Sequence, residues 1–300
     1  MKRNNLMKIL MCQLVLASLI TPVFGQKQEK PIIFAVINDG NSLEPIAFIE
    51  KGKLTAPVGG DSDEKLIESF NKTYYKPKTV YRLIFGGVNA GTVTVVSSNA
   101  KSDCAKNMAG VGTQSTKTKL GGFIMALATA SVAKKAASGL RRKPTTAEKT
   151  EIDSLVRTEF ANQKVAASAI KNLHYQNLTA LDVDNDKKVE FVGSYWVETS
   201  ATERALLFFI AEKNAKGKYE FGFSNFHNVK KDEVMSTNLK DIDTGIYHEL
   251  LLDAFDYDDD GVSEIFTYTQ SFEGAGFTAY KRESGKWEKV FEGSNYHCGY

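Results

Sequence analysis

The chain has 300 residues, 42% apolar and 25% charged, which excludes a disordered polyelectrolyte and leaves ample length for a buried core. Its formal net charge of +2 excludes an overall positive field of the kind that attracts nucleic acid. The charges are unevenly placed, because residues 101–143 hold nine Lys or Arg and one acid, whereas residues 249–300 hold eleven acids and four bases. This asymmetry fits an anionic partner, but the simpler interpretation is that the two segments attract each other or stay solvated.

Residues 1–25 have the pattern of a signal peptide. Three basic residues within the first eight are followed by an apolar segment, residues 9–20. This segment is shorter than the roughly 20 residues of a membrane span. We therefore expect cleavage near Gly25, no transmembrane span, and a secreted or periplasmic mature protein. Lipidation of Cys12 is an alternative, although Met11 stands where a small residue normally precedes a lipidated cysteine.

Two cysteines, Cys104 and Cys298, remain once the signal peptide is removed. In an oxidising compartment an even pair of cysteines is a candidate disulfide. The sequence does not show whether their Cα atoms approach within bonding range. A cysteine nucleophile is the alternative, but no local Cys/His signature accompanies either residue.

The region after the signal peptide is predicted to be rich in strands. Short runs of β-branched and aromatic residues alternate with Gly-rich and Asn-rich turns. These runs cover residues 32–37, 45–49, 80–86 and 91–97. One helix is expected at residues 62–74, because Asp61 or Ser62 suits an N-cap and apolar residues follow at helical spacing.

Two further segments of this region carry weaker signals. Residues 99–119 are polar and rich in Gly, Ser, Thr and Lys, so we expect a long loop. Residues 123–138 fit a buried strand at their start, whereas their Ala-rich continuation would suit a helix.

A second helix is predicted over about residues 146–163. Thr145 and Glu148 form a capping-box pattern, and apolar residues follow at helical spacing. The basic run that ends at Pro144 marks a boundary before this helix. The expected divisions are residues 1–25 (signal peptide), 26–143 (N-terminal β-rich domain), 144–176 (helical connector) and 177–300 (two-repeat β region).

The last region contains an internal repeat. Residues 178–192 align without gaps with residues 252–266, at an offset of 74 residues. Each copy is predicted to run strand, acidic loop, strand, and then a hairpin closed by a Gly turn. Such repetition is typical of stacked or radially arranged sheets. Two units are too few for a closed propeller, so we expect a smaller sheet packed on the helix, in a mainly β (α+β) fold of short antiparallel sheets with two helices.

The second acidic loop has the chemistry of a calcium site. Calcium binds six to eight oxygen atoms at about 2.3–2.6 Å, and carboxylates at alternate positions of a loop can converge on it. When Asp256 is counted as position 1 of the loop, Gly261 stands at position 6. A glycine there permits the sharp turn that brings the carboxylates together. The predicted ligands are the side chains of Asp256, Asp258, Asp260 and Glu264 and the backbone carbonyl of Val262. An EF-hand is excluded, because position 12 is Thr267 rather than Glu.

This pattern resembles the calcium loops of FG-GAP/VCBS-type repeats, which occur in β-propeller blades and in many exported bacterial proteins. The resemblance covers residues 177–300 and implies a pair of β-propeller-blade-like repeats that hold Ca²⁺ for structural reasons. The first loop departs from the pattern, because Lys187 replaces the Gly and costs about 1 kcal/mol if its φ is positive. Its weaker candidate ligands are Asp182, Asp184, Asp186, Glu190 and the carbonyl of Lys188. We expect either a weak site or a loop that keeps the turn without the ion.

No catalytic signature accompanies these loops. The four histidines lack zinc-site spacing, and no nucleophile elbow or phosphate loop is present. We therefore expect an exported non-enzymatic protein with calcium-stabilised β repeats, as a binding or scaffold module of the cell envelope or exterior. An anionic polysaccharide or another envelope protein is the expected kind of partner, and nucleic acid is not. The alternative is an exported, glycan-directed hydrolase, with Asp253 and either Glu249 or Glu273 as paired carboxylates.

Overall fold

The computed structural model describes residues 29–135 and 137–298. The predicted signal peptide, with Gly25 and Cys12, therefore lies outside the described residues. The described chain is mainly β, with three antiparallel sheets and two helices longer than one or two turns. None of the helices in the described residues is long and apolar enough to span a membrane.

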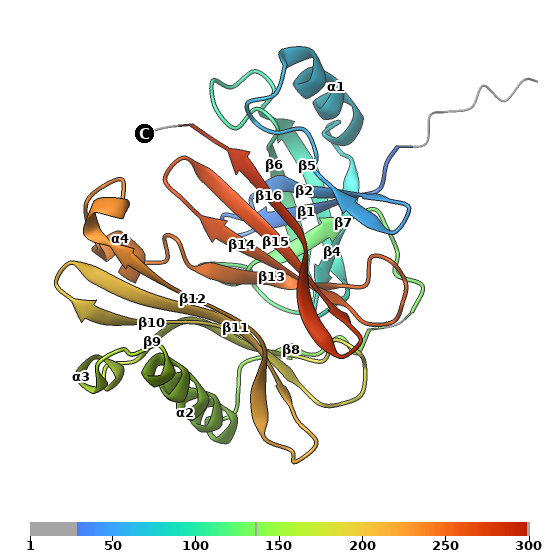
Figure 1. The fold of residues 1–300 in the computed structure, drawn as a ribbon. Coiled ribbons are helices and arrows are strands. Elements are labelled where there is room, and N and C mark those ends of the chain that lie inside the picture. Colours follow the sequence, from blue (N-terminus) through green and yellow to red (C-terminus); the bar gives the residue numbers. More distant parts are fainter. Residues whose placement is uncertain (1–28, 136, 299–300) are drawn as a thin grey trace, which may run out of the picture.

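The N-terminal strands form a closed six-stranded barrel (Figure 1). The strand order is β1-β7-β4-β5-β6-β2, and the pairing of β1 with β2 closes the ring, while β3 extends β2 as a hairpin. The bounds are β1 (Ile32–Ile37), β2 (Ser42–Glu50), β3 (Lys53–Thr55), β4 (Val80–Phe85), β5 (Val88–Ser98), β6 (Ala109–Ser115) and β7 (Ala126–Thr129). The four strands predicted in this region are confirmed as β1, β2, β4 and β5.

Successive side chains of β1 point to opposite faces of the strand, and both faces are buried. Phe34 and its even-numbered neighbours belong to the cluster that fills the barrel, whereas Ile33 and its odd-numbered neighbours belong to a second cluster outside it. The predicted helix is confirmed as α1 (Glu64–Tyr74). Its cap is Asp63, which accepts a hydrogen bond from the Lys65 amide, rather than the expected Asp61 or Ser62. Its residues Phe70 and Tyr74 join the interior cluster and cover that part of the barrel.

Two expectations for this region need correction. The expected loop at residues 99–119 contains β6, a Gly-rich strand of weak intrinsic β preference that is ordered by pairing with β5 along most of its length. In the ambiguous segment 123–138, residues Ala126–Thr129 form β7, which pairs with both β1 and β4. The Ala-rich residues that follow form no helix in the described part of the segment, because the local helix preference has no apolar face to pack.

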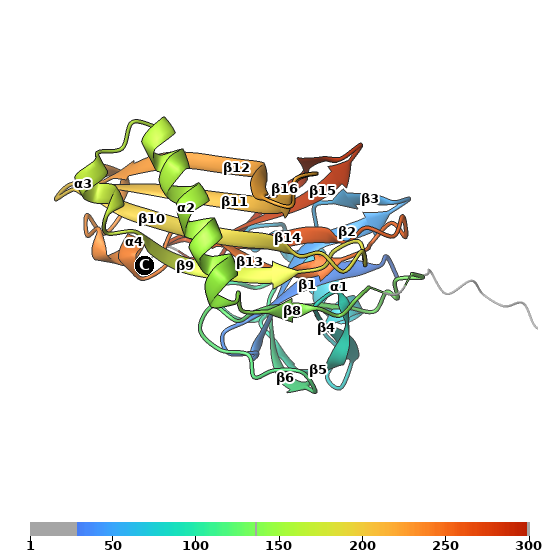
Figure 2. The same cartoon turned by 90° about the horizontal axis from the view of Figure 1, so that it is seen from below.

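The first repeat forms a five-stranded sheet with order β12-β11-β10-β9-β8, and a helix lies across one face of it (Figure 2). Its elements are β8 (Arg141–Arg142), β9 (His174–Leu181), β10 (Glu190–Ser200), β11 (Glu203–Lys213), β12 (Tyr219–Lys230), α2 (Thr146–Asn162) and α3 (Ala167–Ile170). The predicted capping box is confirmed: Thr145 and Glu148 exchange hydrogen bonds at the start of α2. Phe160 of α2 packs in one core cluster with Phe191 and Phe209 of the sheet. Full burial of each such side chain contributes about 1.5–3 kcal/mol.

The second repeat forms a separate four-stranded sheet. Its strands are β13 (Glu249–Phe255), β14 (Glu264–Gln270), β15 (Gly274–Glu283) and β16 (Lys286–Tyr296), and it follows η1 (Lys231–Glu233) and α4 (Lys240–Asp243). The expectation of one small sheet on the helix is therefore wrong, since the repeats form two sheets and only the first contacts α2. No propeller forms in the described part of the chain.

The second-repeat sheet is the central layer of the molecule, because both of its faces are apolar. Leu251 and Tyr280 face the first-repeat sheet, and the Tyr280 ring stacks on Phe208 at 5.4 Å. Leu250 and Phe266 belong instead to the cluster shared with the outside of the barrel. The layers therefore follow the order helix α2, first-repeat sheet, second-repeat sheet, barrel (Figure 1).

The predicted disulfide is present. Cys104 and Cys298 are bonded, with 5.3 Å between their Cα atoms and a sequence separation of 194. This bond connects the loop after β5 to the end of the last strand. A disulfide of this kind fits an exported protein, since it persists in oxidising compartments.

Candidate metal centre

The two acidic loops occupy equivalent places, between β9 and β10 and between β13 and β14. Their hydrogen bonds repeat at the 74-residue offset. In each loop the residue at position 2 donates its amide to the position-9 Glu, at 3.1 Å for Val183 to Glu190 and at 3.2 Å for Tyr257 to Glu264. The amides at positions 5 and 7 bind the Asp side chains two residues earlier in both loops. The sequence repeat is therefore also a structural repeat.

Backbone conformation explains the need for special residues in these turns. Position 4 has positive φ in both loops, 60° at Asn185 and 65° at Asp259, and these residue types tolerate it. Position 6 also has positive φ, 99° at Gly261 but 68° at Lys187. The first loop therefore keeps the turn with a lysine in the left-handed region, at a cost of about 1–2 kcal/mol.

In the second loop, Asp256, Asp258 and Asp260 form a triad whose oxygen atoms lie within 4.8 Å of one another. Asp256 is 4% exposed, and its Oδ1 has no hydrogen-bond partner, whereas its Oδ2 accepts the Gly261 amide at 3.0 Å. A buried carboxylate oxygen without a partner carries a desolvation penalty, which a cation in the triad would remove. Clustered carboxylate oxygens are the ligands that calcium prefers. These residues therefore fit a calcium ion.

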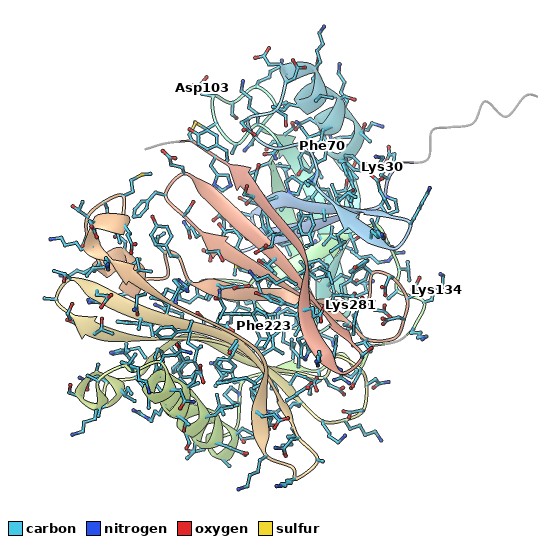
Figure 3. The ribbon with its side chains drawn as sticks, in the orientation of Figure 1. Lys30, Phe70, Asp103, Lys134, Phe223 and Lys281 are labelled. Atoms are coloured by element: carbon cyan, nitrogen blue, oxygen red, sulfur yellow. A yellow bond between two sulfur atoms is a disulfide. The ribbon has the colours of Figure 1, made fainter. Side chains whose placement is uncertain are left out.

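Lys281 supplies a positive charge to this loop from β15. Its Nζ lies 2.7 Å from Asp260 Oδ2 and 3.2 Å from Glu264 Oε1, and it also contacts Asp258 Oδ2. Figure 3 shows this side chain at the second-repeat sheet. Because the ammonium group uses two carboxylates of the triad, a metal ion that binds through them has to displace it.

Two further lysines hold the outer side of the loop. Lys134, which Figure 3 labels at the edge of the molecule, pairs with Asp259 at 2.8 Å, and its amide binds the same carboxylate at 2.6 Å. Lys135 Nζ donates to the carbonyl of Asp260 at 2.5 Å. The side chain of Asp259 thus points away from the triad.

In the first loop the converging residues are Asp182, Asp184 and Glu190, with oxygen atoms again within 4.8 Å. Asp182 repeats the feature of its counterpart, since it is 7% exposed and its Oδ1 has no hydrogen-bond partner. Asp186 is instead paired with Lys188 at 2.7 Å. Arg282 reaches Asp184 at 2.8 Å, so this loop too has a cation from β15.

The two loops lie side by side in the structure. The Ser263 amide donates to the carbonyl of Val183 at 2.7 Å, which connects one loop to the other through the backbone. Successive side chains of a strand point to opposite faces. Accordingly, Lys281 serves the second loop and Arg282 the first, so a single strand end supplies counter-charges to both.

Burial and mutual repulsion perturb the acids of both loops. Burial, with the nearby charge of Asp258, raises the pKa of Glu264 to about 8. Burial likewise raises the pKa of Glu190 to about 7, although the Val183 amide opposes the shift. Burial also raises the pKa of Asp256. These directions show that burial disfavours the charged form of these three carboxyl groups, whereas their lysine partners lower the pKa of Asp260 and of Asp186.

The carboxylates of the hydrolase alternative have structural partners. Asp253 is fully buried, pairs with Arg141 at 2.7 Å and accepts amide hydrogen bonds at the β4–β5 turn. Glu249 accepts hydrogen bonds from Thr267 at 2.6 Å and from Tyr280 at 2.7 Å. Asp253 is therefore part of a buried ion pair, and both hydroxyl groups bind the same oxygen, Oε1, of the half-buried Glu249.

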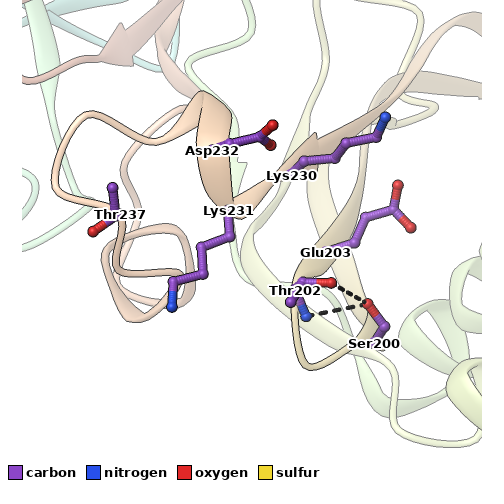
Figure 4. A pocket seen from close by; sticks show the side chains of 7 residues that line it. All are labelled: Ser200, Thr202, Glu203, Lys230, Lys231, Asp232 and Thr237. Atoms are coloured by element: carbon purple, nitrogen blue, oxygen red, sulfur yellow. Dashed lines mark hydrogen bonds between the residues drawn. The ribbon is translucent and has the colours of Figure 1, made fainter.

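Two further places bring polar side chains together. Ser194 and His248 lie 3.2 Å apart, but both are nearly inaccessible, at 2% and 1% exposed, so the pair is a core contact. Figure 4 shows an open pocket at the β10–β11 turn, where the hydroxyl groups of Ser200 and Thr202 bind each other. This pocket carries side chains of both signs and favours neither cations nor anions. Its lining residues are Ser200, Thr202, Glu203, Lys230, Lys231, Asp232 and Thr237.

The sequence identified the acids of both loops but not their cationic partners. Lys281 and Arg282 follow the second loop by about twenty residues and have no motif of their own. Lys213 precedes the Gly turn of the first repeat as Lys281 does that of the second, yet it lies over the Tyr219 ring instead. Repeat comparison therefore does not predict the pairing.

Comparison with protein-family models, with curated proteins and with solved structures finds no match to this chain.

Proposed function

We propose that this chain is an exported, non-enzymatic protein whose paired β repeats are stabilised by calcium and form a binding or scaffold module of the cell envelope or exterior. A signal peptide cleaved near Gly25 would direct the export, and the Cys104–Cys298 disulfide supports it. The acidic loops support a likeness to FG-GAP/VCBS-type repeats, with the sheet of each repeat in the place of a blade.

The observation that carries the proposal is the buried Oδ1 of Asp256, which converges with Asp258 and Asp260 and has no hydrogen-bond partner. The same feature recurs at Asp182 in the first loop. A single buried carboxylate oxygen without a hydrogen-bond partner would only lower the stability of the fold. Because such an oxygen recurs at position 1 of both loops, we infer that both loops bind the same kind of ligand there. A divalent cation meets that requirement, because it coordinates the oxygen directly.

Calcium at this place would stabilise the joint between the two repeat sheets, since the loops contact each other through Ser263 and Val183. Extracellular calcium modules bind with dissociation constants of about 10⁻⁴–10⁻³ M. A ligand that binds only the folded state raises stability by about 2.7 kcal/mol at a hundredfold excess over its dissociation constant.

The test is thermal unfolding in calcium and in chelator, with an isosteric variant and a matched control. Calcium is expected to raise the wild-type midpoint, and Asp256→Asn is expected to lose most of that rise. Asp259→Asn changes the same charge in the same loop but outside the triad, so it should keep the rise. An unchanged wild-type midpoint in millimolar calcium, or equal losses in both variants, would contradict the proposal.

A further inference from the structure

A cleft of about 590 Å³ lies where the barrel meets the first-repeat sheet. Its walls come from the end of β4, from the segments around residues 117–124 and 141–149, and from β9. This volume is within the range of about 300–1,000 Å³ that is usual for small-ligand sites. The cleft shares no lining residue with the two acidic triads.

All charged side chains that line the cleft are cations. Three of them are neutralised by carboxylates: Arg141 by Asp253, Arg142 by Glu148 and Lys149 by Asp153. Two lysines have no carboxylate within ion-pair distance in the described chain. Lys117 donates only to the neutral carbonyl of Gly139, at 3.0 Å, and Lys143 is exposed. The cleft therefore has a net positive charge that favours an anion.

Apolar surface lies next to these lysines. Tyr175 is 52% exposed and Ile124 is 40% exposed, so both present apolar surface to the cleft. The Tyr175 ring has Lys149 Nζ 4.8 Å from its centroid. Amide and hydroxyl side chains, including Gln176 and Asn177, also line the cleft. An acyl chain would favour an unbroken apolar wall, whereas a sugar ring offers one apolar face and hydrogen-bonding groups at its rim.

We propose that this cleft binds an acidic saccharide, with a sugar ring on Tyr175 and carboxylates on Lys117 and Lys143. The proposal rests on the proposed function, to which it adds the ligand class of the binding module. Removing one charge-assisted hydrogen bond costs about 1.5–3 kcal/mol, so loss of one lysine contact is expected to weaken binding at least tenfold.

The experiment titrates the mature protein with tetragalacturonate and with neutral maltotetraose, in calcium and in chelator. Binding of the acidic tetrasaccharide alone is expected. The double variant Lys117→Gln/Lys143→Gln and the single variant Tyr175→Ala should each bind at least tenfold more weakly. Lys143→Gln is the variant of choice if the double variant unfolds, because it breaks no described hydrogen bond.

The control is Lys230→Gln/Lys231→Gln, which removes two lysines from the pocket of Figure 4 and should bind as the wild type does. No binding by the wild type, equal loss in the control, or preferential binding of an anionic amphiphile such as decanoate would overturn the proposal. Thermal midpoints with calcium, measured on the same samples, separate the two hypotheses. If calcium still raises the thermal midpoint but no saccharide binds, only the saccharide proposal is refuted. If the saccharide binds but calcium does not change the midpoint, only the calcium proposal is refuted.

Discussion

Replacing Lys281 by Met is expected to strengthen calcium binding at the second loop. In the wild type the ammonium group contacts Asp258, Asp260 and Glu264, and the lysine side chain is only 11% exposed. Calcium has to displace this group before it can use the carboxylates. Hydrogen bonds to charged groups contribute about 1.5–3 kcal/mol. If one such contribution is the net cost of displacement, the variant should bind calcium about 10- to 100-fold more tightly.

Isothermal titration with calcium measures this change directly. Lys289→Met is the matched control, because Lys289 lies on the neighbouring strand and pairs with Glu292 outside the loops. In chelator, Lys281→Met should also melt at a lower temperature than the wild type, since its three carboxylates then have no counter-charge. A dissociation constant equal to or above that of the wild type would refute displacement as the mechanism.

Three further outcomes are expected. Replacing Cys104 and Cys298 by Ser should lower the free energy of unfolding by about 2–5 kcal/mol in denaturant titrations, because the bond closes a loop of 194 residues; an unchanged midpoint would contradict this. Gly261→Ala should cost about 1–2 kcal/mol in the same assay and weaken calcium binding, because φ at this position is 99°. The hydrogen bond to Glu44 raises the pKa of His297, so its stabilisation is complete below the ordinary value of 6.5 and is lost as pH rises through the folded value. His297→Gln should therefore destabilise more at about pH 5.5 than at about pH 8.5, and an equal loss at both would count against the contact.

Local signals in the sequence were sufficient for the helices and for most strands. The capping box of α2, Thr145 with Glu148, is a short-range contact that the sequence displays, whereas the cap of α1 is Asp63 and not the expected Asp61 or Ser62. The strand β6 was missed because Gly110 and Gly112 have little β preference, and the strand depends on its partner β5. Closure of the barrel was missed for the same reason, since it depends on which distant strands pair.

The candidate metal site also has a part that the sequence predicts and a part that it does not. Asp256 and its alternating partners are close in sequence, so their convergence follows from the turn itself. Lys281 comes from another strand, and its contact with the loop depends on the register of β15 against β14. The cleft at Tyr175 is assembled from four separate segments and has no sequence motif. Sequence patterns therefore predict the acids of a loop, but not the cations that the fold brings to them.

The position of the second-repeat sheet has a consequence for how the chain matures. The last fifty or so residues supply the layer that both the barrel and the first-repeat sheet cover with apolar side chains. Until those residues arrive, two hydrophobic surfaces have nothing to bury them, and Cys104 has no partner to bond. The apolar surfaces of the barrel and of the first-repeat sheet are therefore covered only when the carboxyl-terminal strands are in place.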